Sequence, residues 1–398
     1  MSYFRSSPAT AFAWLIAVAP LAAAAAQTSR APAARAAAAP ALVGRWDLTI
    51  RADSTSFPGW LEVRRDGSGF GGRLQWGWGH ATPIAAITVA GDSFAFTWPN
   101  EEAPREPASR ARGRVTRGTG RTLSALLVGG DDKQYALTGT RAPSLARTPA
   151  DTAGWSAPAD LLAGGLGGWH PRGEKNGWTV ENGVLSNTLP SSDLISGGRF
   201  TDFKLHVEVN VPKDGNSGIY LRGRDEVQVL DSYGKPPGSR EMGGIYGQLT
   251  PSRNAAKPAG EWQSYDITLV GRRVKVVLNG VTIINWAEIP GITGGALDSD
   301  EGAPGPIMLQ GDHTAVRYRN IVVTPAQRRK GGATTQRRKV RETEKRKVGR
   351  LGGGSPPRCR SGRRPRDLPV PGWSARSRSP GWRGRRVRWR GGRRARCR

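Results

Sequence analysis

The sequence predicts an all-β protein, in which a small antiparallel sheet or barrel precedes a larger antiparallel β-sandwich and a basic tail. Short runs of alternating apolar and polar residues recur about every ten residues and are separated by Gly, Pro and Asp, as expected for strands and turns. No run keeps a helical period over two turns or more. A length of 398 residues leaves room for two domains of about 150 residues each.

The N-terminus has the pattern of a secretory signal. Arg5 precedes an apolar run from Ala11 to Ala25, and small residues stand before Gln27. The run is shorter than the roughly 20 apolar residues that cross a bilayer, and no Cys marks a lipid-anchor site there. We therefore expect residues 1–26 to be a cleaved leader and the protein to be periplasmic or secreted, with an uncleaved Ala-rich leader as the alternative. Residues 27–41, rich in Ala and Pro, are expected to form a disordered linker.

Residues 42–141 are predicted to form a small all-β domain. The alternating runs are bounded by turn residues throughout, and no motif within them indicates a role. The expected strands are Leu42–Ile50, Trp60–Val63, Gly72–Trp76, Ile84–Val89, Ser93–Trp98, Leu123–Val128 and Tyr135–Thr140.

Residues 142–158 form a Pro- and Ala-rich connector, and residues 159–325 are predicted to form the sandwich. Asn279-Gly280 is a favoured type I′ pair and joins two of its expected strands as a hairpin. The expected strands are Trp178–Val180, Gly183–Leu185, Phe203–Val209, a hairpin over residues 215–231, Gly243–Gln248, Trp262–Val270, Val274–Leu278, Val281–Trp286, Ile307–Gln310 and Val316–Val323.

The hairpin over residues 215–231 is the first candidate site. Successive strand side chains point to opposite faces, so the apolar Ile219, Leu221, Val227 and Val229 share one face of the sheet. An aromatic ring, two guanidiniums, a carboxylate and an amide share the other face, a combination suited to a polyhydroxylated ligand. These residues are Tyr220, Arg222, Arg224, Glu226 and Gln228.

Glu226 and Asp231 are the candidate acid and base on this hairpin. A pair of carboxyl groups serves proton transfer on a sugar, and the spacing looks like the Glu-x-Asp-x-x-Glu strand of jelly-roll glucanases, with the non-ionising Gln228 at its centre. Asp231 is out of phase with Glu226 unless a bulge or the strand end redirects it. The alternative is that Glu226 forms a structural ion pair with Arg222 or Arg224 across the hairpin.

Gln310-Gly311-Asp312-His313 is the second candidate site. Asp312 followed by His313 can orient an imidazole, supply a base or contribute two metal ligands. The alternative is a loop Asp that satisfies its own backbone. His313 has the best claim among the four histidines, whereas His206 is expected to be an ordinary solvated side chain on a strand.

Three aromatic residues complete the candidate binding surface. Tyr220, Tyr246 and Trp262 would stack on the C–H faces of a pyranose, with Arg, Gln228 and Gln310 binding its hydroxyls. Packing in the core is the alternative for each ring, and for Trp262 it is the stronger one.

The basic charge is concentrated in the C-terminal tail. Residues 326–398 hold 27 Lys+Arg and 3 Asp+Glu, which accounts for +24 of the net +28, and the remaining 33 basic and 29 acidic residues nearly balance. Cys359 and Cys397, the only cysteines, also lie there. The tail is expected to be disordered, either as a nucleic-acid-binding arm or as an out-of-frame translation of GC-rich DNA. Its content of Arg, Gly and Pro, which have GC-rich codons, favours the out-of-frame translation. We expect no nucleic-acid binding by the folded domains, and the sequence does not indicate an oligomeric state.

Several motifs between about residues 155 and 325 together resemble the 3-keto-disaccharide hydrolase domain family, long catalogued as a domain of unknown function. The resemblance implies a concanavalin A-like jelly roll, in proteins that are usually exported, acting on 3-keto-glycosides. Thr314 and Asp225 depart from the expected Gly and aromatic residue. The motifs are Gly164 to Trp169, Ser192 to Ile195, Phe203, Gly215 to Arg222, Glu226 to Asp231, Ile245 to Gly247, Gly260 to Gln263 and Leu309 to His313.

This resemblance leaves two mechanisms open. A ketone at C3 makes the C2 proton acidic, so that Glu226 or His313 would abstract it, with Asp231 or Asp312 as partner and Arg222 and Gln228 binding oxygens. Direct hydrolysis by two carboxyl groups is the other mechanism. No cofactor is indicated with certainty, and a divalent metal would also be compatible with the residues. A carbohydrate-binding module without turnover is the alternative function.

Overall fold

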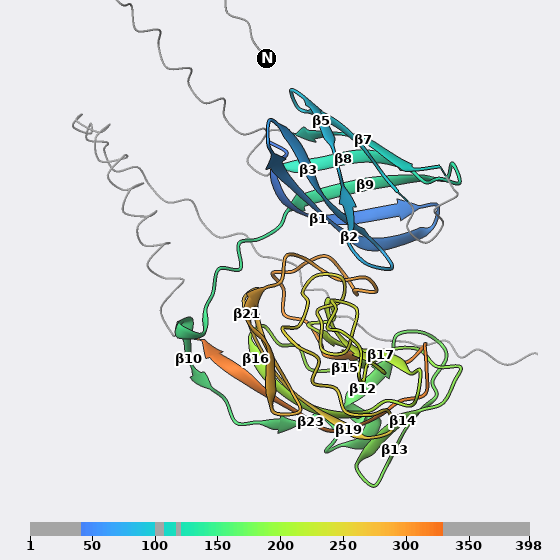
Figure 1. Cartoon of the computed structure of the whole chain (residues 1–398), viewed down its shortest axis with the longest axis vertical. Helices are drawn as coiled ribbons and strands as arrows, with labels where there is room; N and C mark the ends of the chain where they lie inside the picture. The colour runs from blue at the N-terminus through green and yellow to red at the C-terminus, as the bar shows by residue number, and fades with distance from the viewer. Residues whose placement is uncertain (1–40, 100–106, 117–120, 329–398) are drawn as a thin grey trace, which may run out of the picture. The chain divides into compact units, whose positions relative to one another are not determined.

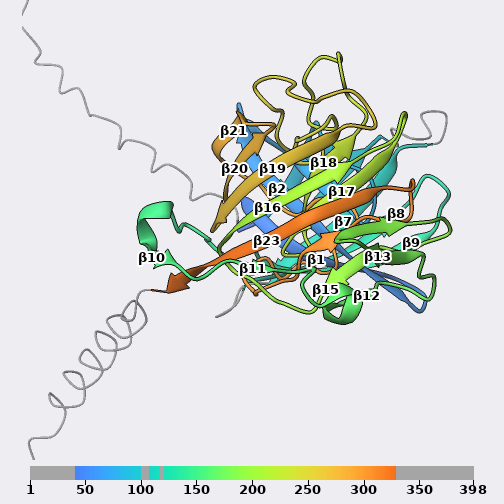
Figure 2. The same cartoon turned by 90° about the horizontal axis from the view of Figure 1, so that it is seen from below.

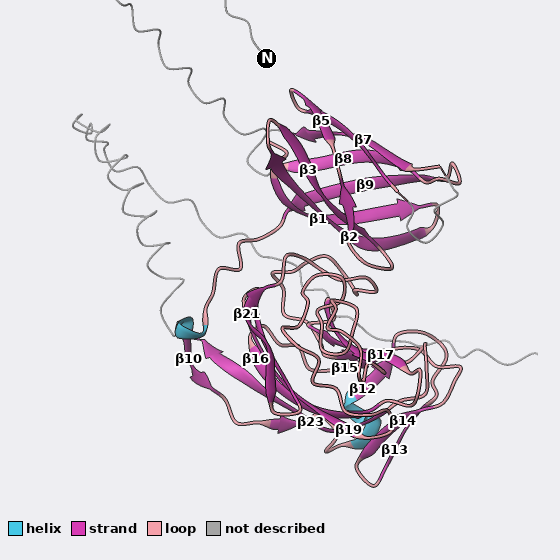
Figure 3. Cartoon of the chain, in the orientation of Figure 1, coloured by secondary structure: helices cyan, strands magenta, loops and turns pink. Residues whose placement is uncertain are grey.

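The computed structural model describes residues 41–99, 107–116 and 121–328, and these residues fall in one compact unit (Figure 1). Strands make up nearly all of the regular structure, and the only helices among the described residues are two short 3-10 turns (Figure 3). The expected leader, residues 27–40 of the expected linker and residues 329–398 of the tail lie outside the described residues. No helix within the described ranges is long and apolar enough to cross a membrane.

The first sheet is nine-stranded and antiparallel, in the order β4-β3-β2-β1-β9-β8-β7-β6-β5. β3 contacts β5, so the sheet curls round until its two ends lie close together, as the expectation of a sheet or barrel allowed. Its strands are β1 Gly44–Ala52, β2 Thr55–Asp66, β3 Gly69–Trp76, β4 Thr82–Ile84, β5 Ile87–Ala90, β6 Ser93–Trp98, β7 Ser109–Thr116, β8 Thr122–Val128 and β9 Gln134–Arg141.

The interior of this curled sheet holds a core of its own. Trp46, Leu48, Ile50 and Leu127 have no exposed surface. Trp46 donates a hydrogen bond from Nε1 to the Leu42 carbonyl at 2.8 Å, which satisfies its one polar group. The first domain is therefore stabilised by an apolar core that is separate from the core of the second domain.

The connector is partly ordered. It contains the 3-10 turn η1 Pro149–Asp151 and the strand β10 Thr152–Trp155, which pairs with the last strand of the second domain. That last strand, β23 Arg317–Arg328, runs three residues past the expected end of the fold at residue 325. The first residues of the expected tail are therefore part of a sheet.

The second domain is an antiparallel sandwich of two sheets, which confirms the predicted all-β fold. The larger sheet follows the order β13-β14-β23-β16-β19-β20-β21, with β10 and β11 also paired to β23. Figure 2 shows β23, β16, β19, β20 and β21 side by side. The strands are β11 Ala159–Asp160, β13 Trp178–Glu181, β14 Val184–Asn187, β16 Phe203–Asn210, β19 Trp262–Val270, β20 Arg273–Leu278, β21 Val281–Glu288 and β23.

The smaller sheet carries the candidate hairpin. Its order is β12-β15-β22-β17-β18, and apolar side chains of both sheets, such as Val209, Val227 and Tyr265, meet in one core. The expected strand Gly243–Gln248 is instead a loop with single bridges from Ile245 to Val227 and Leu249. The strands are β12 Trp169–Pro171, β15 Leu194–Ser196, β17 Asn216–Leu221, β18 Asp225–Leu230 and β22 Met308–Leu309, and the 3-10 turn η2 Gly165–Gly168 precedes β12.

Candidate active site

The hairpin β17–β18 forms in the predicted register. Tyr220 faces Glu226, and Gly218 faces Gln228 across the two strands. Gly218 is required here, because a Cβ at this position would lie 2.2 Å from Glu226 Oε1. The hairpin thus presents a phenol, a carboxyl group and an amide on one face.

These side chains open into a small pocket of about 170 Å³. β17 and β18 supply one wall, the segment after β22 supplies a second, and loops of both domains close it. Its lining residues are Trp78, Gly79, Asp193, Asn216, Tyr220, Glu226, Gln228, Tyr246, Gly294, Gly295, Gln310, Asp312 and His313.

Glu226 is the most perturbed acid of this pocket. Only 4% of the residue is exposed, and burial raises the pKa of its carboxyl group to about 8, although the Tyr220 hydroxyl and His313 act in the opposite direction. Its backbone N–H donates to Thr293 Oγ1 at 2.9 Å, which fixes the strand against the loop above it. At neutral pH this carboxyl group is therefore protonated and can give a proton to a bound ligand.

Tyr220 lies between Glu226 and a backbone carbonyl. Its hydroxyl is 3.0 Å from Glu226 Oε2 and 3.0 Å from the Gly294 carbonyl oxygen. Since a phenol has one hydrogen, it can donate to only one of these acceptors at a time. Burial raises the pKa of Tyr220 well above its ordinary value, so the hydroxyl stays protonated.

Asp312 and His313 form a pair at the pocket's edge. His313 Nδ1 lies 2.5 Å from Asp312 Oδ1, and both side chains are about half exposed. This contact raises the pKa of His313 and lowers that of Asp312. The carboxylate holds Nδ1–H, so Nε2 is the nitrogen left to exchange a proton with a ligand.

Two glutamine side chains supply further polar atoms. Gln228 Oε1 and Gln310 Oε1 are buried and receive no hydrogen bond from the described residues, whereas Gln228 Nε2 donates to Asn216 Oδ1 at 3.2 Å. A buried amide oxygen without a donor is costly, and hydroxyl groups of a ligand would satisfy both. The pocket therefore suits a hydroxylated molecule.

Asp193 and Arg172 belong to the site although neither was a candidate. Asp193 lines the pocket, and burial raises its pKa. Arg172 Nη1 contacts Asp193 Oδ2 at 3.3 Å and donates to the Gly295 carbonyl at 2.7 Å. The motif Ser192 to Ile195 contained Asp193, but no spacing linked it to the hairpin.

Four of the candidate residues do not line this pocket. Arg222 binds Asp225 at 3.1 Å and Arg224 binds Asp298 at 2.6 Å, so neither is paired with Glu226. Asp231 Oδ2 accepts the Asp214 N–H at 3.0 Å, and the Trp262 ring lies under the Arg319 guanidinium at 4.0 Å. The strand alternation fails for the two arginines because the chain turns there, with Arg222 at φ 55° and Gly223 at φ 68°.

The remaining candidates, Tyr246 and Gln310, line the pocket as expected. Within the described ranges, no three His, Cys, Asp or Glu side chains are grouped as a metal-binding set. The part of the chain that the structure describes therefore does not define a ligand set for the divalent metal that the sequence left open.

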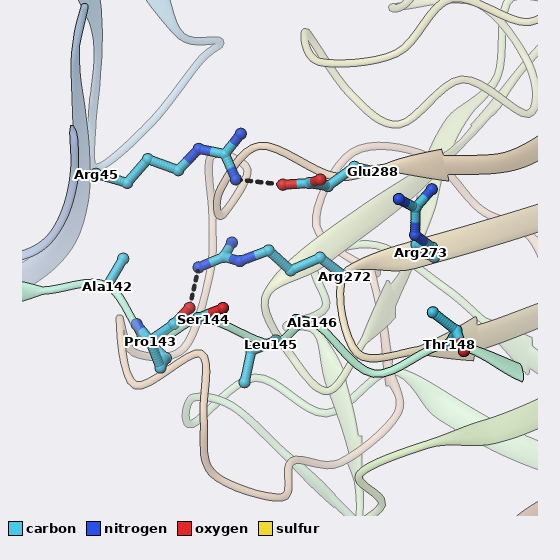
Figure 4. A pocket seen from close by; sticks show the side chains of 10 residues that line it. All are labelled: Arg45, Ala142, Pro143, Ser144, Leu145, Ala146, Thr148, Arg272, Arg273 and Glu288. Atoms are coloured by element: carbon cyan, nitrogen blue, oxygen red, sulfur yellow. Dashed lines mark hydrogen bonds and ion pairs between the residues drawn. The ribbon is translucent and has the colours of Figure 1, made fainter. Parts of the chain in front are cut away.

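A second cavity, of about 400 Å³, lies along the connector (Figure 4). It contains three arginines, each already bound: Arg45 to Glu288 at 2.5 Å, Arg272 to Glu301 at 2.9 Å and Arg273 to the Trp286 carbonyl at 3.2 Å. Arg272 also donates to the Pro143 carbonyl at 3.2 Å. The last of these contacts fastens the connector, and none of the residues that line the cavity has the raised carboxyl pKa of Glu226.

The N-terminal domain also contributes to the pocket, which the sequence did not suggest. Trp78 and Gly79 in the β3–β4 loop line it, and Gly294 packs so closely on Gly79 that a Cβ would lie 2.1 Å from the Gly79 carbonyl oxygen. Gly295 donates to the Gly77 carbonyl at 3.0 Å. In the sequence, Trp78-Gly79-His80 carries no motif that links this loop to the hairpin.

The second domain matches a known family model. Residues 159–324 match the model described as a 3-keto-alpha-glucoside-1,2-lyase-like domain. The chain is also 26% identical over 138 residues to a 3-keto-disaccharide hydrolase of Bacteroides thetaiotaomicron, a match covering 25% of this chain and 48% of that protein. The chain thus spans about half the length of this curated relative.

Two solved structures are similar to the chain. Both are candidate glycosyl hydrolases of Parabacteroides distasonis. The first is 33% identical to this chain. The match covers 42% of this chain and 83% of that chain, with a TM-score of 0.38. The second is 22% identical to this chain. The match covers 43% of this chain and 100% of that chain, with a TM-score of 0.35.

Proposed function

Because residues 159–324 of this chain belong to the 3-keto-alpha-glucoside-1,2-lyase-like domain family, we propose that the pocket around Glu226 cleaves 3-keto-glycosides by proton transfer. The observation that carries the proposal is a buried carboxyl group with a pKa of about 8 in the same pocket as an oriented Asp–His pair. Such a pair of groups can act as acid and base near neutral pH.

The proposed reaction is an elimination across C1 and C2. A ketone at C3 acidifies the C2 proton, and neutral His313 takes it through Nε2 to leave an enolate. When the enolate re-forms the C3 carbonyl, the electron pair of its C2–C3 double bond moves to form the C1–C2 double bond. The bond from C1 to the leaving oxygen breaks at the same time, and the oxygen keeps that electron pair. That oxygen takes the proton of Glu226 and leaves as an alcohol. Addition of water across C1–C2 would then complete a net hydrolysis.

The other lining residues support this reaction. Asp312 holds His313 in the tautomer that leaves Nε2 free, and Tyr220 keeps the Glu226 carboxyl group in place. The amide oxygens of Gln228 and Gln310 accept hydrogen bonds from sugar hydroxyls. Burial of Glu226 and of the two amide oxygens strengthens their interactions with a bound ligand.

A leaving-group comparison tests the proposal. Glu226→Gln keeps the shape of the side chain and removes its proton, so release of methanol from a methyl 3-keto-glucoside should fall by about 10²–10⁴-fold. Release of p-nitrophenol from the matching aryl glycoside needs no proton donor and should change far less.

Asp231→Asn serves as the matched control, since Asp231 lies on the same hairpin but outside the pocket. It should keep wild-type rates with both substrates. Equal losses with both leaving groups in Glu226→Gln would reject the acid role. Sugar binding without any cleavage by the wild-type protein would favour the carbohydrate-binding module instead.

A further inference from the structure

The pocket around Glu226 is too small for a whole glycoside. Its volume of about 170 Å³ lies below the range of about 300–1,000 Å³ in which proteins enclose drug-sized ligands. We therefore expect it to hold a single sugar ring, with the group attached to C1 outside it.

A larger cavity begins at the wall of this pocket. It measures about 620 Å³, lies in the first domain and shares Trp78 and Gly79 with the pocket around Glu226. Trp78 is 68% exposed, and the Arg172 guanidinium lies 5.7 Å from its ring centroid. Arg172 also binds Asp193 and the Gly295 carbonyl. It therefore links Trp78, in the wall that the two cavities share, to the pocket around Glu226.

The large cavity is lined by aromatic rings in fixed mutual contact. Trp76 meets Tyr135 edge-on at 4.9 Å, Trp98 at 6.2 Å and Phe57 at 6.1 Å. Trp98 is buried, whereas the other three rings are only partly covered. Such rings bind a flat or chair-shaped ring through its apolar face, and polar side chains of the same cavity, such as Asp53, can reach hydroxyls at its edge.

We propose that this aromatic cavity binds the group attached to C1 of the substrate, so that the first domain holds the leaving group while the second domain performs the chemistry. The ligand chemistry is a ring with one apolar face, either an aryl group or a second sugar. The identity of the substrate in this inference rests on the function proposed above, whereas the cavity and its rings do not.

A substrate series tests the proposal in the full chain. Tyr135→Ala should lower kcat/KM for a 3-keto-disaccharide or a phenyl 3-keto-glucoside by about five- to tenfold, the range expected for one lost stacking contact. With methyl 3-keto-glucoside, which has nothing to place in the cavity, the change should stay within twofold. The substrate whose rate falls more distinguishes a sugar from an aryl group as the natural occupant.

Leu126→Ala is the matched control, because Leu126 is an exposed residue on the adjacent strand β8 and lines neither cavity. It should leave all three rates unchanged. Equal losses by Tyr135→Ala on the long and short substrates, or no loss on either, would overturn the proposal.

A binding measurement separates this proposal from the proposed function. Phenyl glucoside and an unoxidised disaccharide lack the ketone, so their binding to Glu226→Gln can be followed by calorimetry without turnover. Binding by at least one of them that weakens in the Glu226→Gln, Tyr135→Ala double variant would support the cavity even if no 3-keto-glycoside is cleaved. Cleavage of the methyl glycoside together with no binding of either probe would keep the function and reject the cavity.

Discussion

Two Asp–His pairs in the sandwich domain differ in what surrounds them. His206 Nδ1 lies 2.8 Å from Asp266 Oδ1 on neighbouring strands of the large sheet, and His313 Nδ1 lies 2.5 Å from Asp312 Oδ1 at the end of the small sheet. Both histidines are partly exposed. Only His313 shares a pocket with a buried carboxyl group, so an oriented imidazole becomes a candidate base through its surroundings rather than through its partner.

Replacing each histidine is the most direct way to break this comparison. His313→Gln should reduce cleavage of a 3-keto-glycoside by about 10²–10⁴-fold, the usual contribution of a general base. His206→Gln should leave the rate within twofold, because that pair lines none of the three cavities. Steady-state kinetics on both variants checks this prediction. A comparable loss of rate in His206→Gln would mean that the surroundings of the two Asp–His pairs do not give them different roles.

Moving the carboxyl group instead of the histidine sharpens the comparison. Gly218→Ala places a methyl group against the Glu226 side chain, which is buried and has little room to move, so we expect about a 10²-fold loss of rate and a loss of about 1–3 kcal/mol in the free energy of unfolding. Gly164→Ala, whose Cβ would meet open space, is the control. Wild-type kinetics in Gly218→Ala would show that the position of Glu226 is unimportant.

The pH dependence gives a smaller and more specific effect. His313 must be neutral to act as a base, so kcat/KM should rise through its pKa, which lies above 6.5. Glu226 must be protonated to act as an acid, so kcat/KM should fall again, about tenfold per pH unit, above its pKa of about 8. His206→Gln should retain the whole bell-shaped profile. A profile that keeps its alkaline limb in Glu226→Gln would contradict the assignment.

Glu226 should also destabilise the fold at alkaline pH. Its pKa is raised from 4.5 to about 8 in the folded protein, so the stability that this proton confers is present below pH 4.5 and is lost as the pH rises to about 8. The loss is at most about 5 kcal/mol for this shift. Glu226→Gln should therefore raise the melting temperature by several degrees at pH 9 relative to wild type, and by much less at pH 5. Equal shifts at both pH values would indicate a packing effect.

The hairpin and most strands could be predicted because their side chains alternate. The structure confirms the strands on both sides of the turn and the shared face of Tyr220, Glu226 and Gln228. β7 escaped prediction because its alternate residues are arginines with only Ala111 and Val115 as buried apolar partners. The run from Ile84 to Val89 breaks into two strands at Ala85 and Ala86.

The composition of the pocket could be predicted only in part. Arg222 and Arg224 turn away because the strand ends before them, and an ionic partner for each lies nearby in space. Asp193, Asn216 and Trp78 come from loops or strand ends, where no periodicity fixes the direction of a side chain. Their approach to Glu226 depends on the packing of segments that lie far apart in the chain. The roles of the site residues stay predictions.

The hydrogen-bonding choices of the Tyr220 hydroxyl couple the Gly294 carbonyl to the protonation state of Glu226. When Glu226 is ionised, the phenol hydrogen turns toward Oε2. When Glu226 is protonated, its own hydrogen can occupy the contact with the phenol oxygen, and the phenol hydrogen then turns to the Gly294 carbonyl. The vibrational frequency of that one carbonyl, followed by isotope labelling, would thus report the charge of Glu226 from a peptide group that itself never titrates.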